Sequence, residues 1–337
     1  MTVSRAAALA WRLRRHHLAG PAASSVEEVV GRLLAVPSWL GDAGAAIGLR
    51  LGDRSAAHDA LRAALVDGRV VTTYAHRGST QVMTPGGAAV HLALRLAGRQ
   101  WERASWRSHY GLEPGDWPRL RAVVRDAVAD RPLTQAELAE AVTRDPAYAH
   151  LGEAFTHRSH TFLKPFGWHG DVRIDTSDGT FRLASTADVP GWTGPLPLEE
   201  AGPLAVRAYL ATYGPATRER VDHWLVDGLS AGRRRVDGWV EALQADGTVV
   251  TLDVEGEPAS CLAGDAGAIA AAEPSDEVVL VPGHDPWVLG PGTADPWIVP
   301  PGHRVHATRG AALALRGGRV VGTWRQGTDG PVVDWFP

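Results

Sequence analysis

The sequence predicts an α+β protein in which one small unit, a pair of helices followed by a two-stranded β-hairpin, occurs three times. Two kinds of local signal support this prediction: a helix-entry pattern that recurs along the chain, and alternating segments with turn residues at their centres. In addition, the chain has 337 residues, which exceeds one average domain and leaves room for several such units.

Two segments have the pattern of a helix that is entered through proline and threonine. In RPLTQAELAEAV (131–142), Thr134 precedes Glu137 by three residues, the spacing of a capping box ahead of an apolar helix face. The segment YGPATRERVDHWL (213–225) repeats the entry, again with apolar residues on one face. Both resemble the second helix of a helix-turn-helix.

Each of these helices is followed by a predicted hairpin. DVRIDTSDGTFRLAS (171–185) reads as two strands about Ser-Asp-Gly, and GTVVTLDVEGEPASCLA (247–263) as two strands about Glu-Gly-Glu-Pro. Upstream, the helical segment 55–68 runs into RVVTTYA and STQVMT, which surround His76-Arg77-Gly78. This pattern is typical of a tandem winged-helix protein, and the alternative is three unrelated α+β pieces.

The spacing of these units predicts four regions. Helices are expected at 89–109 and 117–129, and the Pro- and Gly-rich segment 187–203 indicates a boundary. Strand-like runs after Val278 predict a small C-terminal β layer. The predicted regions are a first winged helix with a helical extension (1–130), a second winged helix (131–190), a third (200–265) and a β-rich segment (275–337).

The composition is that of a globular protein, with 45% apolar and 21% charged residues. No apolar stretch approaches the roughly 18 residues that cross a membrane. The opening MTVSRAAALAWRLRRHHL places its basic cluster after its apolar patch, so we expect an amphipathic helix rather than a signal peptide. Cys261 is the single cysteine, which excludes a disulfide framework and favours a cytoplasmic location.

The charges leave nucleic-acid binding open. The formal net charge is −4, but 33 of the 34 basic residues are arginine and Lys164 is the one lysine. Arginine binds phosphate bidentately, so local clusters can contact DNA despite a mildly acidic total. The alternative is that these clusters are solvated helix faces. They are Arg12, Arg14 and Arg15; Arg103 and Arg107; and Arg233, Arg234 and Arg235.

Several segments, in order, carry a family resemblance. They are WRLRRHHL (11–18), GRVVTTYAHRGSTQVMTP (68–85), RLAGRQWERASW (95–106), LTQAELAEAV (133–142), FLKPFGWHGDV (162–172), VLVPGHDPWVLGPG (279–292), PPGHRV (300–305) and GRVVGTWR (318–325). Together they resemble the AlkZ-like winged-helix proteins, which include bacterial DNA glycosylases that remove alkylated or crosslinked bases. The resemblance implies DNA binding on a concave face and hydrolysis of the N-glycosidic bond without a metal.

The catalytic element implied by the resemblance is a short Gln-apolar-Gln or Gln-apolar-Asp motif. In RLLAVPSWLGDA (32–43), its two polar positions are occupied by Pro37 and Trp39, and Gln81 stands where the first wing often has histidine. Neither proline nor an indole N–H can accept a proton or stabilise an oxocarbenium-like sugar by charge. Base excision is therefore one alternative. The others are a non-catalytic DNA-binding or regulatory protein and a protein that binds a small molecule on the same scaffold.

Three residues near this motif are candidates for catalysis. Ser38 has no adjacent base, so a hydroxyl that caps the next turn is favoured over a nucleophile. Asp42 is a candidate for activating water or, alternatively, an acidic helix start. Trp39 is a candidate for stacking on a displaced base or, alternatively, a core residue. We expect Pro37 to begin a short helix whose first turn exposes Trp39 to a concave cavity.

The remaining candidates would contact DNA. Lys164 and Arg77 are predicted phosphate contacts, with solvated side chains as the alternative. The full set is Arg77, Gln81, Lys164, His169, Asp285, Trp287 and Arg304, with a structural turn as the alternative for Asp285 and Trp287. His157, His160 and His169 lack a clear further ligand, so we predict no metal and no cofactor. The predicted partners are duplex DNA, including alkylated DNA, or a small molecule, with no membrane and a monomeric chain.

Overall fold

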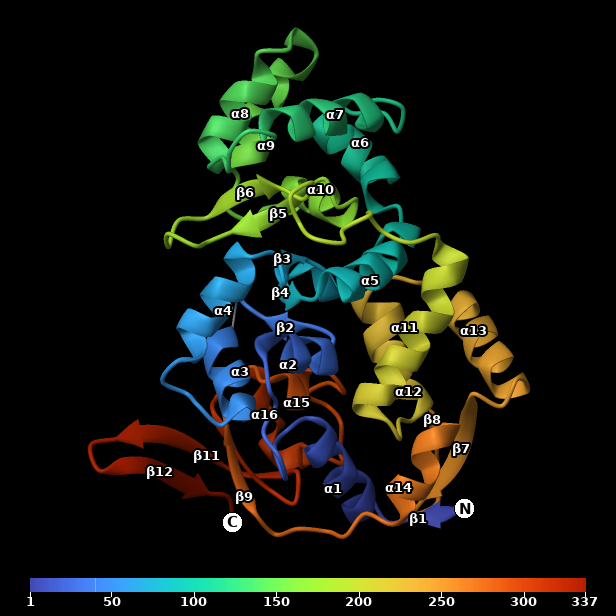
Figure 1. Ribbon diagram of the computed structural model, residues 1–337. Coiled ribbons are helices and arrows are strands. Elements are labelled where there is room, and N and C mark those ends of the chain that lie inside the picture. The colour runs from blue at the N-terminus through green and yellow to red at the C-terminus, as the bar shows by residue number, and fades with distance from the viewer. Residues whose placement is uncertain (40) are drawn as a thin grey trace.

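The computed structural model describes residues 1–39 and 41–337, which form an α+β protein as predicted. Helices alternate with short strands along the chain, and the described strands form three separate sheets (Figure 1). No described helix combines the length and the apolar character that a bilayer crossing requires.

A five-stranded sheet joins two of the predicted hairpins. Its order is β2-β4-β3-β5-β6. The strands are β2 (Val36–Pro37), β3 (Val71–Tyr74), β4 (Thr80–Met83), β5 (Val172–Asp175) and β6 (Arg182–Ser185). The hairpins β3–β4 and β5–β6 form where they were predicted, and they meet at an antiparallel pair of Thr72 with Ile174. The first two predicted units therefore share one sheet.

Helices precede and separate these hairpins. The described helices up to the second hairpin are α1 (Arg5–Arg15), α2 (Val26–Leu33), α3 (Ala43–Leu51), α4 (Ala57–Val66), α5 (Pro85–Ala97), α6 (Ala104–Tyr110), α7 (Trp117–Ala127), α8 (Gln135–Thr143), α9 (Gly152–Thr156) and α10 (Lys164–Trp168). The continuous helix predicted at 89–109 is wrong, because Arg99 adopts a left-handed conformation (φ 41°) between α5 and α6. The predicted capping box of Thr134 and Glu137 does begin α8.

The third predicted hairpin has its own sheet. Strands β7 (Val249–Val254) and β8 (Glu257–Leu262) pair antiparallel, and β1 (Thr2–Val3) adds to β7 in parallel. The helices of this part are α11 (Leu198–Tyr213), α12 (Arg218–Asp222), α13 (Arg233–Ala245) and α14 (Ala266–Ala270). A single π-helical turn, His223–Gly228, follows α12. The amino-terminal strand thus ties the start of the chain to this sheet.

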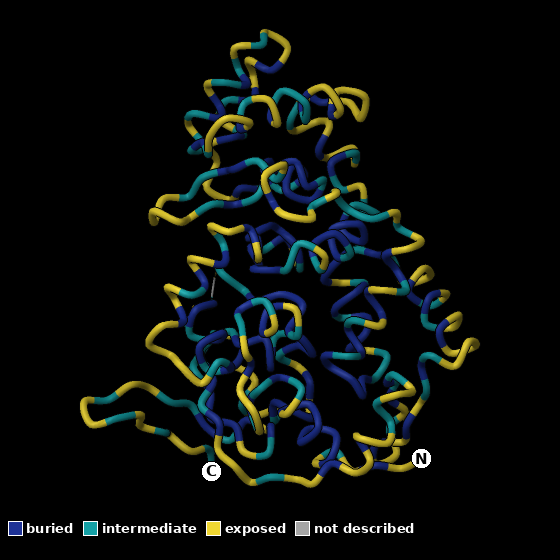
Figure 2. The backbone as a smooth tube through the Cα atoms, in the orientation of Figure 1, coloured by how far each residue is buried: buried dark blue, intermediate teal, exposed yellow. Residues whose placement is uncertain are grey.

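The C-terminal β layer is an antiparallel sheet of four strands in the order β12-β11-β10-β9. Its elements are β9 (Val278–Val281), β10 (Leu313–Arg316), β11 (Arg319–Gly327) and β12 (Gly330–Trp335), with α15 (Pro286–Leu289) and α16 (Arg304–Thr308) between β9 and β10. The far end of the β11–β12 hairpin extends from the body of the molecule and is exposed (Figure 2).

Helix α1 packs into two cores. Leu9 and Leu13 belong to the core under the C-terminal sheet, whereas Ala8 and Trp11 belong to the core under β7 and β8. Even Arg12 is buried, and its guanidinium donates a hydrogen bond to the Pro215 carbonyl (3.0 Å). The prediction of an amphipathic first helix is therefore too simple, because the β sheets cover α1 on two sides.

A fully buried ion pair connects α3 to α15. The Arg50 guanidinium donates two hydrogen bonds to the Asp285 carboxylate, at 2.7 and 2.9 Å, across 235 residues of sequence. Asp285 also accepts a hydrogen bond from the Trp287 backbone N–H at the start of α15. Trp287 is itself buried. The prediction that Asp285 and Trp287 contact DNA is therefore wrong, since neither side chain reaches the surface.

We expect Arg50→Ala to lower the free energy of unfolding by about 3–5 kcal/mol, because it leaves the Asp285 carboxylate buried without its partner. Urea unfolding followed by tryptophan fluorescence measures the change. Arg62→Ala is the matched control, because Arg62 pairs with Asp59 on the exposed surface of α4 and such pairs contribute little. Equal midpoints for the Arg50 and Arg62 variants would contradict the assignment.

Candidate functional site

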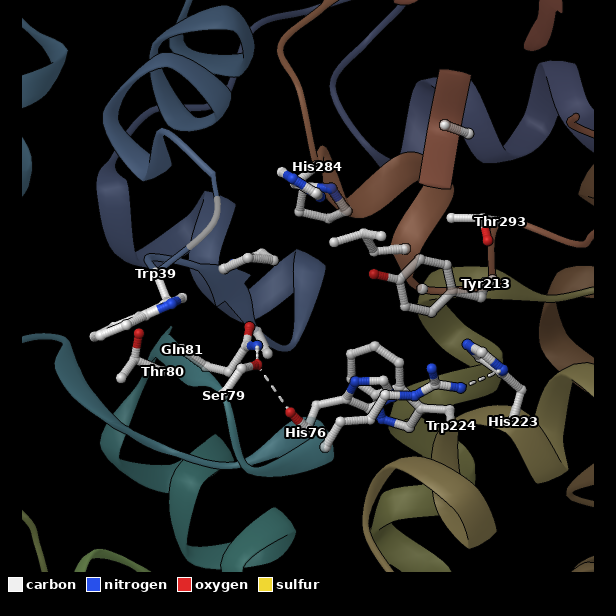
Figure 3. A pocket seen from close by; sticks show the side chains of 18 of the residues that line it. Trp39, His76, Ser79, Thr80, Gln81, Tyr213, His223, Trp224, His284 and Thr293 are labelled. Carbon is white, nitrogen blue, oxygen red and sulfur yellow. Dashed lines mark hydrogen bonds between the residues drawn. The ribbon is translucent and has the colours of Figure 1, made fainter. Parts of the chain in front are cut away.

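A cavity of about 420 Å³ lies where β2 and β4 meet the end of α11, the π-helical turn and α15 (Figure 3). We refer to it as the first cavity. Its walls are mainly rings, those of Trp39, His76, Tyr213, His223, Trp224 and His284. Ligand sites in proteins have this volume and this apolar character. The first cavity is therefore the candidate site for a planar ligand.

Strand β2 forms one wall of the first cavity. Pro37 pairs in register with Gln81 of β4, and the Ser38 N–H continues the pairing by donating to the Thr80 carbonyl (3.1 Å). The predicted helix at Pro37 is therefore wrong. An edge strand tolerates proline because no partner on its open side needs its N–H. The Ser38 hydroxyl does not cap a helix either, since it donates to Thr80 Oγ1 (3.0 Å).

Trp39 faces the first cavity, as predicted. Its side chain is 57% exposed and lines the cavity beside Thr80 (Figure 3). The indole also contacts the His160 ring edge to face, with centroids 5.4 Å apart. Trp39 is therefore held at the rim of the cavity rather than in a core.

Asp42 has a structural position. Its carboxylate caps α3 by accepting the Ala45 N–H (2.8 Å), and it lies 2.9 Å from His58 Nε2. This placement favours the acidic helix start over the activation of water. Among residues 1–39 and 41–337, no carboxylate lines the first cavity.

Two imidazoles of the first cavity, those of His76 and His223, have lowered pKa values. His76 stacks on Trp224 with centroids 4.3 Å apart, and burial lowers its pKa well below the ordinary value. The pKa of His223 is also lowered, by burial and by the nearby Arg77 guanidinium, which donates to His223 Nδ1 (3.1 Å). Arg77 lies in the turn between β3 and β4, so its position at the tip of the hairpin agrees with the prediction.

Three glycines lie against rings that line the first cavity. A Cβ at Gly228, Gly290 or Gly292 would overlap the ring of His76, Tyr213 or His223, respectively. Sequence reasoning missed all of them, together with the cavity-lining roles of His223 and Trp224. The Gly-Pro-Gly run at 290–292 signals only a turn, whereas the need for glycine comes from rings on other segments.

A second cavity, of about 320 Å³, adjoins the first. The two share Trp39, Arg77, Ser79 and Thr80 as lining residues. Lys164, at the start of α10, lines only the second. The Pro37–Trp39 segment and the cation candidates Arg77 and Lys164 are therefore neighbours in space, as a common site requires.

The comparisons with known proteins agree with this geometry. The sequence pattern described as DNA glycosylase AlkZ-like matches residues 41–333. The chain belongs to the AlkZ-like DNA glycosylase family. It is 30% identical over 336 residues to an interstrand DNA cross-link repair glycosylase of Streptomyces sahachiroi. This alignment covers 97% of this chain and 89% of that protein. It also superimposes on the solved structure of the DNA glycosylase AlkZ of S. sahachiroi with a TM-score of 0.90 and 28% identity, over 100% of this chain and 92% of the other.

In this AlkZ-like chain, the other predicted DNA contacts are dispersed. Gln81 is buried but lines the first cavity, and its Nε2 donates to Ser79 Oγ (2.7 Å). Arg304 is exposed at the start of α16, one turn before cavity residues Ala307 and Thr308. His169 lines neither cavity.

The histidines considered for a metal site have other contacts. His169 Nδ1 is paired with the Pro165 carbonyl (2.8 Å), and its ring packs on Trp101. His157 pairs with Ser159 and His160 with Tyr74. No group of three or more potential metal-binding side chains occurs among residues 1–39 and 41–337.

We expect the AlkZ-like protein to lose stability as the pH falls below about 6.5, the ordinary histidine pKa, because the unfolded chain then binds protons that folded His76 does not. His76→Gln should weaken this pH dependence. Midpoints of urea unfolding at pH 7.5 and 5.5 measure it, with the exposed His109→Gln variant as the control. An unchanged pH dependence in His76→Gln would show that His76 titrates normally.

Proposed function

We propose that this AlkZ-like protein binds damaged duplex DNA and receives a displaced nucleobase in the first cavity. The observation that carries the proposal is the position of the cavity, which is lined by Pro37 and Trp39 at the two sites of the polar motif. The relative from S. sahachiroi is described as an interstrand DNA cross-link repair glycosylase, which supports damaged duplex DNA as the target. The aromatic walls suit a flat base, because base–aromatic stacking contributes about 1–3 kcal/mol per base.

The same proposal includes three winged-helix modules with the predicted boundaries. Helices precede each of the hairpins β3–β4, β5–β6 and β7–β8, which supports the proposal even though the first two hairpins share a sheet. A DNA substrate also requires the compartment that holds the chromosome. A cytoplasmic location therefore fits this function.

The chemistry of the first cavity predicts weak base excision. Breaking the N-glycosidic bond develops positive charge on the sugar and needs a positioned water. Pro37 offers no polar side chain, and Trp39 offers only an N–H donor. Gln81 can accept a hydrogen bond from water but cannot take its proton at neutral pH. Excision should therefore be confined to lesions whose base is already cationic and leaves readily.

Binding of a small planar molecule is a second candidate function. It is favoured by the aromatic rings in the lining and by the absence of carboxylates among the described cavity residues. A protein that fails to bind duplex DNA but binds such a molecule would support this candidate instead.

We expect binding to a roughly 20-base-pair duplex to weaken steeply as salt rises, with log affinity falling by about 0.9 per log unit of salt for each phosphate neutralised. Fluorescence anisotropy between about 50 and 200 mM salt measures the slope. Duplexes with and without one N7-methylguanine show whether the lesion is preferred. No binding at low salt, or an affinity that salt does not change, is the contrary result.

We expect little release of free base from N7-methylated duplex by the wild-type protein, and none from neutral lesions. Pro37→Gln combined with Trp39→Gln restores the two polar positions of the family motif and should raise the release rate by about tenfold or more, since single polar groups of this kind contribute about 10²–10³. Chromatography of released base measures the rate.

The matched control for the restored motif combines Pro37→Ala with Trp39→Ala, which opens the cavity without adding polar groups. Equal rates for the Gln and Ala double variants would show that these positions do not determine activity. Rapid release of neutral bases by the wild type would also contradict the interpretation.

A further inference from the structure

The second cavity has more positive charge in its lining than the first. Arg77 lines both cavities, Arg158 and Lys164 line only the second, and no carboxylate lines the second among residues 1–39 and 41–337. The hydroxyl-bearing residues Tyr74, Ser79, Thr80 and Ser159 also line it, and Ser79 and Thr80 are shared with the first cavity. Such a lining is complementary to an anion with several oxygens.

The turn at Gly78 brings two cations together. A Cβ at Gly78 would lie 3.4 Å from Lys164 Nζ and 3.6 Å from Arg95 Nη2, and the residue has φ of 68°. The turn therefore passes directly over both charged groups. The adjacent residue, Arg77, also lines the second cavity, and its guanidinium donates to His223 Nδ1 on the side of the first cavity.

Arg95 is fixed by neutral partners. Its guanidinium donates to Ser230 Oγ (2.6 Å) and Gln100 Oε1 (3.1 Å) and lies 4.5 Å from the Trp168 ring centroid. The side chain is nine-tenths buried, and its Nε is buried without a hydrogen-bond partner. The Arg95 guanidinium therefore keeps a fixed position next to Lys164, and no carboxylate among the described residues pairs with it.

The surroundings of Lys164 favour a bound anion. Burial and the Arg95 charge lower the pKa of Lys164, and among residues 1–39 and 41–337 no carboxylate lines the second cavity to offset them. The buried ion pairs of the described chain neutralise other arginines, such as Arg50 and Arg220. A bound anion would relieve the repulsion between Lys164 and Arg95.

We propose that the second cavity binds the backbone phosphate that flanks the displaced nucleotide, with Lys164 and Arg77 contacting the phosphate oxygens. The inference rests on the proposed function, in which the base of that nucleotide occupies the first cavity. Trp39 lines both cavities and then lies against the sugar between base and phosphate. The two cavities together take one nucleotide of the strand.

A scan with uncharged methylphosphonates tests this assignment. Each phosphate near an N7-methylguanine is replaced singly in a duplex, and affinities are measured by anisotropy. For the wild type, we expect one position next to the lesion to lose on the order of tenfold in affinity, as for a charged hydrogen bond. Lys164→Gln should lose a similar factor on unmodified backbone, show a salt slope smaller by about 1, and lose nothing more at that position.

Three variants control the scan. Lys164→Arg keeps the charge and should keep the sensitive position. Arg319→Gln removes an exposed arginine that lines neither cavity and should leave the scan unchanged. If Lys164→Gln fails to fold by thermal unfolding, Arg77→Gln at the exposed hairpin tip takes its place.

The possible results distinguish a failure of the phosphate site from a failure of the proposed function. A wild type that binds duplex but loses affinity equally at every position overturns the phosphate site alone. The same holds if Lys164→Gln and wild type give identical scans. A wild type that binds no duplex overturns the proposed function, and the phosphate site with it.

Discussion

The buried pair of Arg50 with Asp285 joins two segments that lead to the first cavity. Arg50 lies near the end of α3, which begins shortly after the cavity residue Trp39, and Asp285 begins α15, whose Pro286 lines the same cavity. The two charges satisfy one another in the interior, so the helices can separate only by exposing or orphaning a charge. The chain makes a second close approach near the start of α3, where a Cβ at Gly41 would lie 3.4 Å from the Gly283 carbonyl. The positions of these cavity-lining segments therefore depend on contacts that lie outside the cavity.

Sequence reasoning succeeded where the determining contacts are local. The capping box of α8 lies within four residues, and the hairpins follow from alternation and turn residues. It failed where contacts between segments distant in the sequence determine strand pairing or burial. The pairing of Thr72 with Ile174, the two-sided burial of α1 and the burial of Asp285 all depend on partners far along the chain. Proline at 37 was expected to begin a helix because local preference alone does not show an edge strand.

The candidate site was predictable in part for the same reason. The resemblance placed Pro37 and Trp39 at the motif, and the expected exposure of Trp39 is confirmed. The rings that complete the first cavity come from separate segments, and only the fold brings His76 onto Trp224. Likewise, Lys164 stood out as the single lysine, whereas Arg95 was indistinguishable from the other arginines in the sequence. Its importance comes from burial beside Gly78.

The glycines that lie against the rings of the first cavity limit which substitutions the fold tolerates. Any side chain at Gly228, Gly290 or Gly292 must displace a ring, so a single substitution there moves a residue that lines the cavity. The rim is different. Pro37 ends the two-residue edge strand β2 and Trp39 follows it, so either side chain can be substituted without displacing a ring behind it. Substitutions at the rim therefore change the polarity of the lining without moving the rings behind it. The shape of the first cavity and the chemistry at its rim can vary independently.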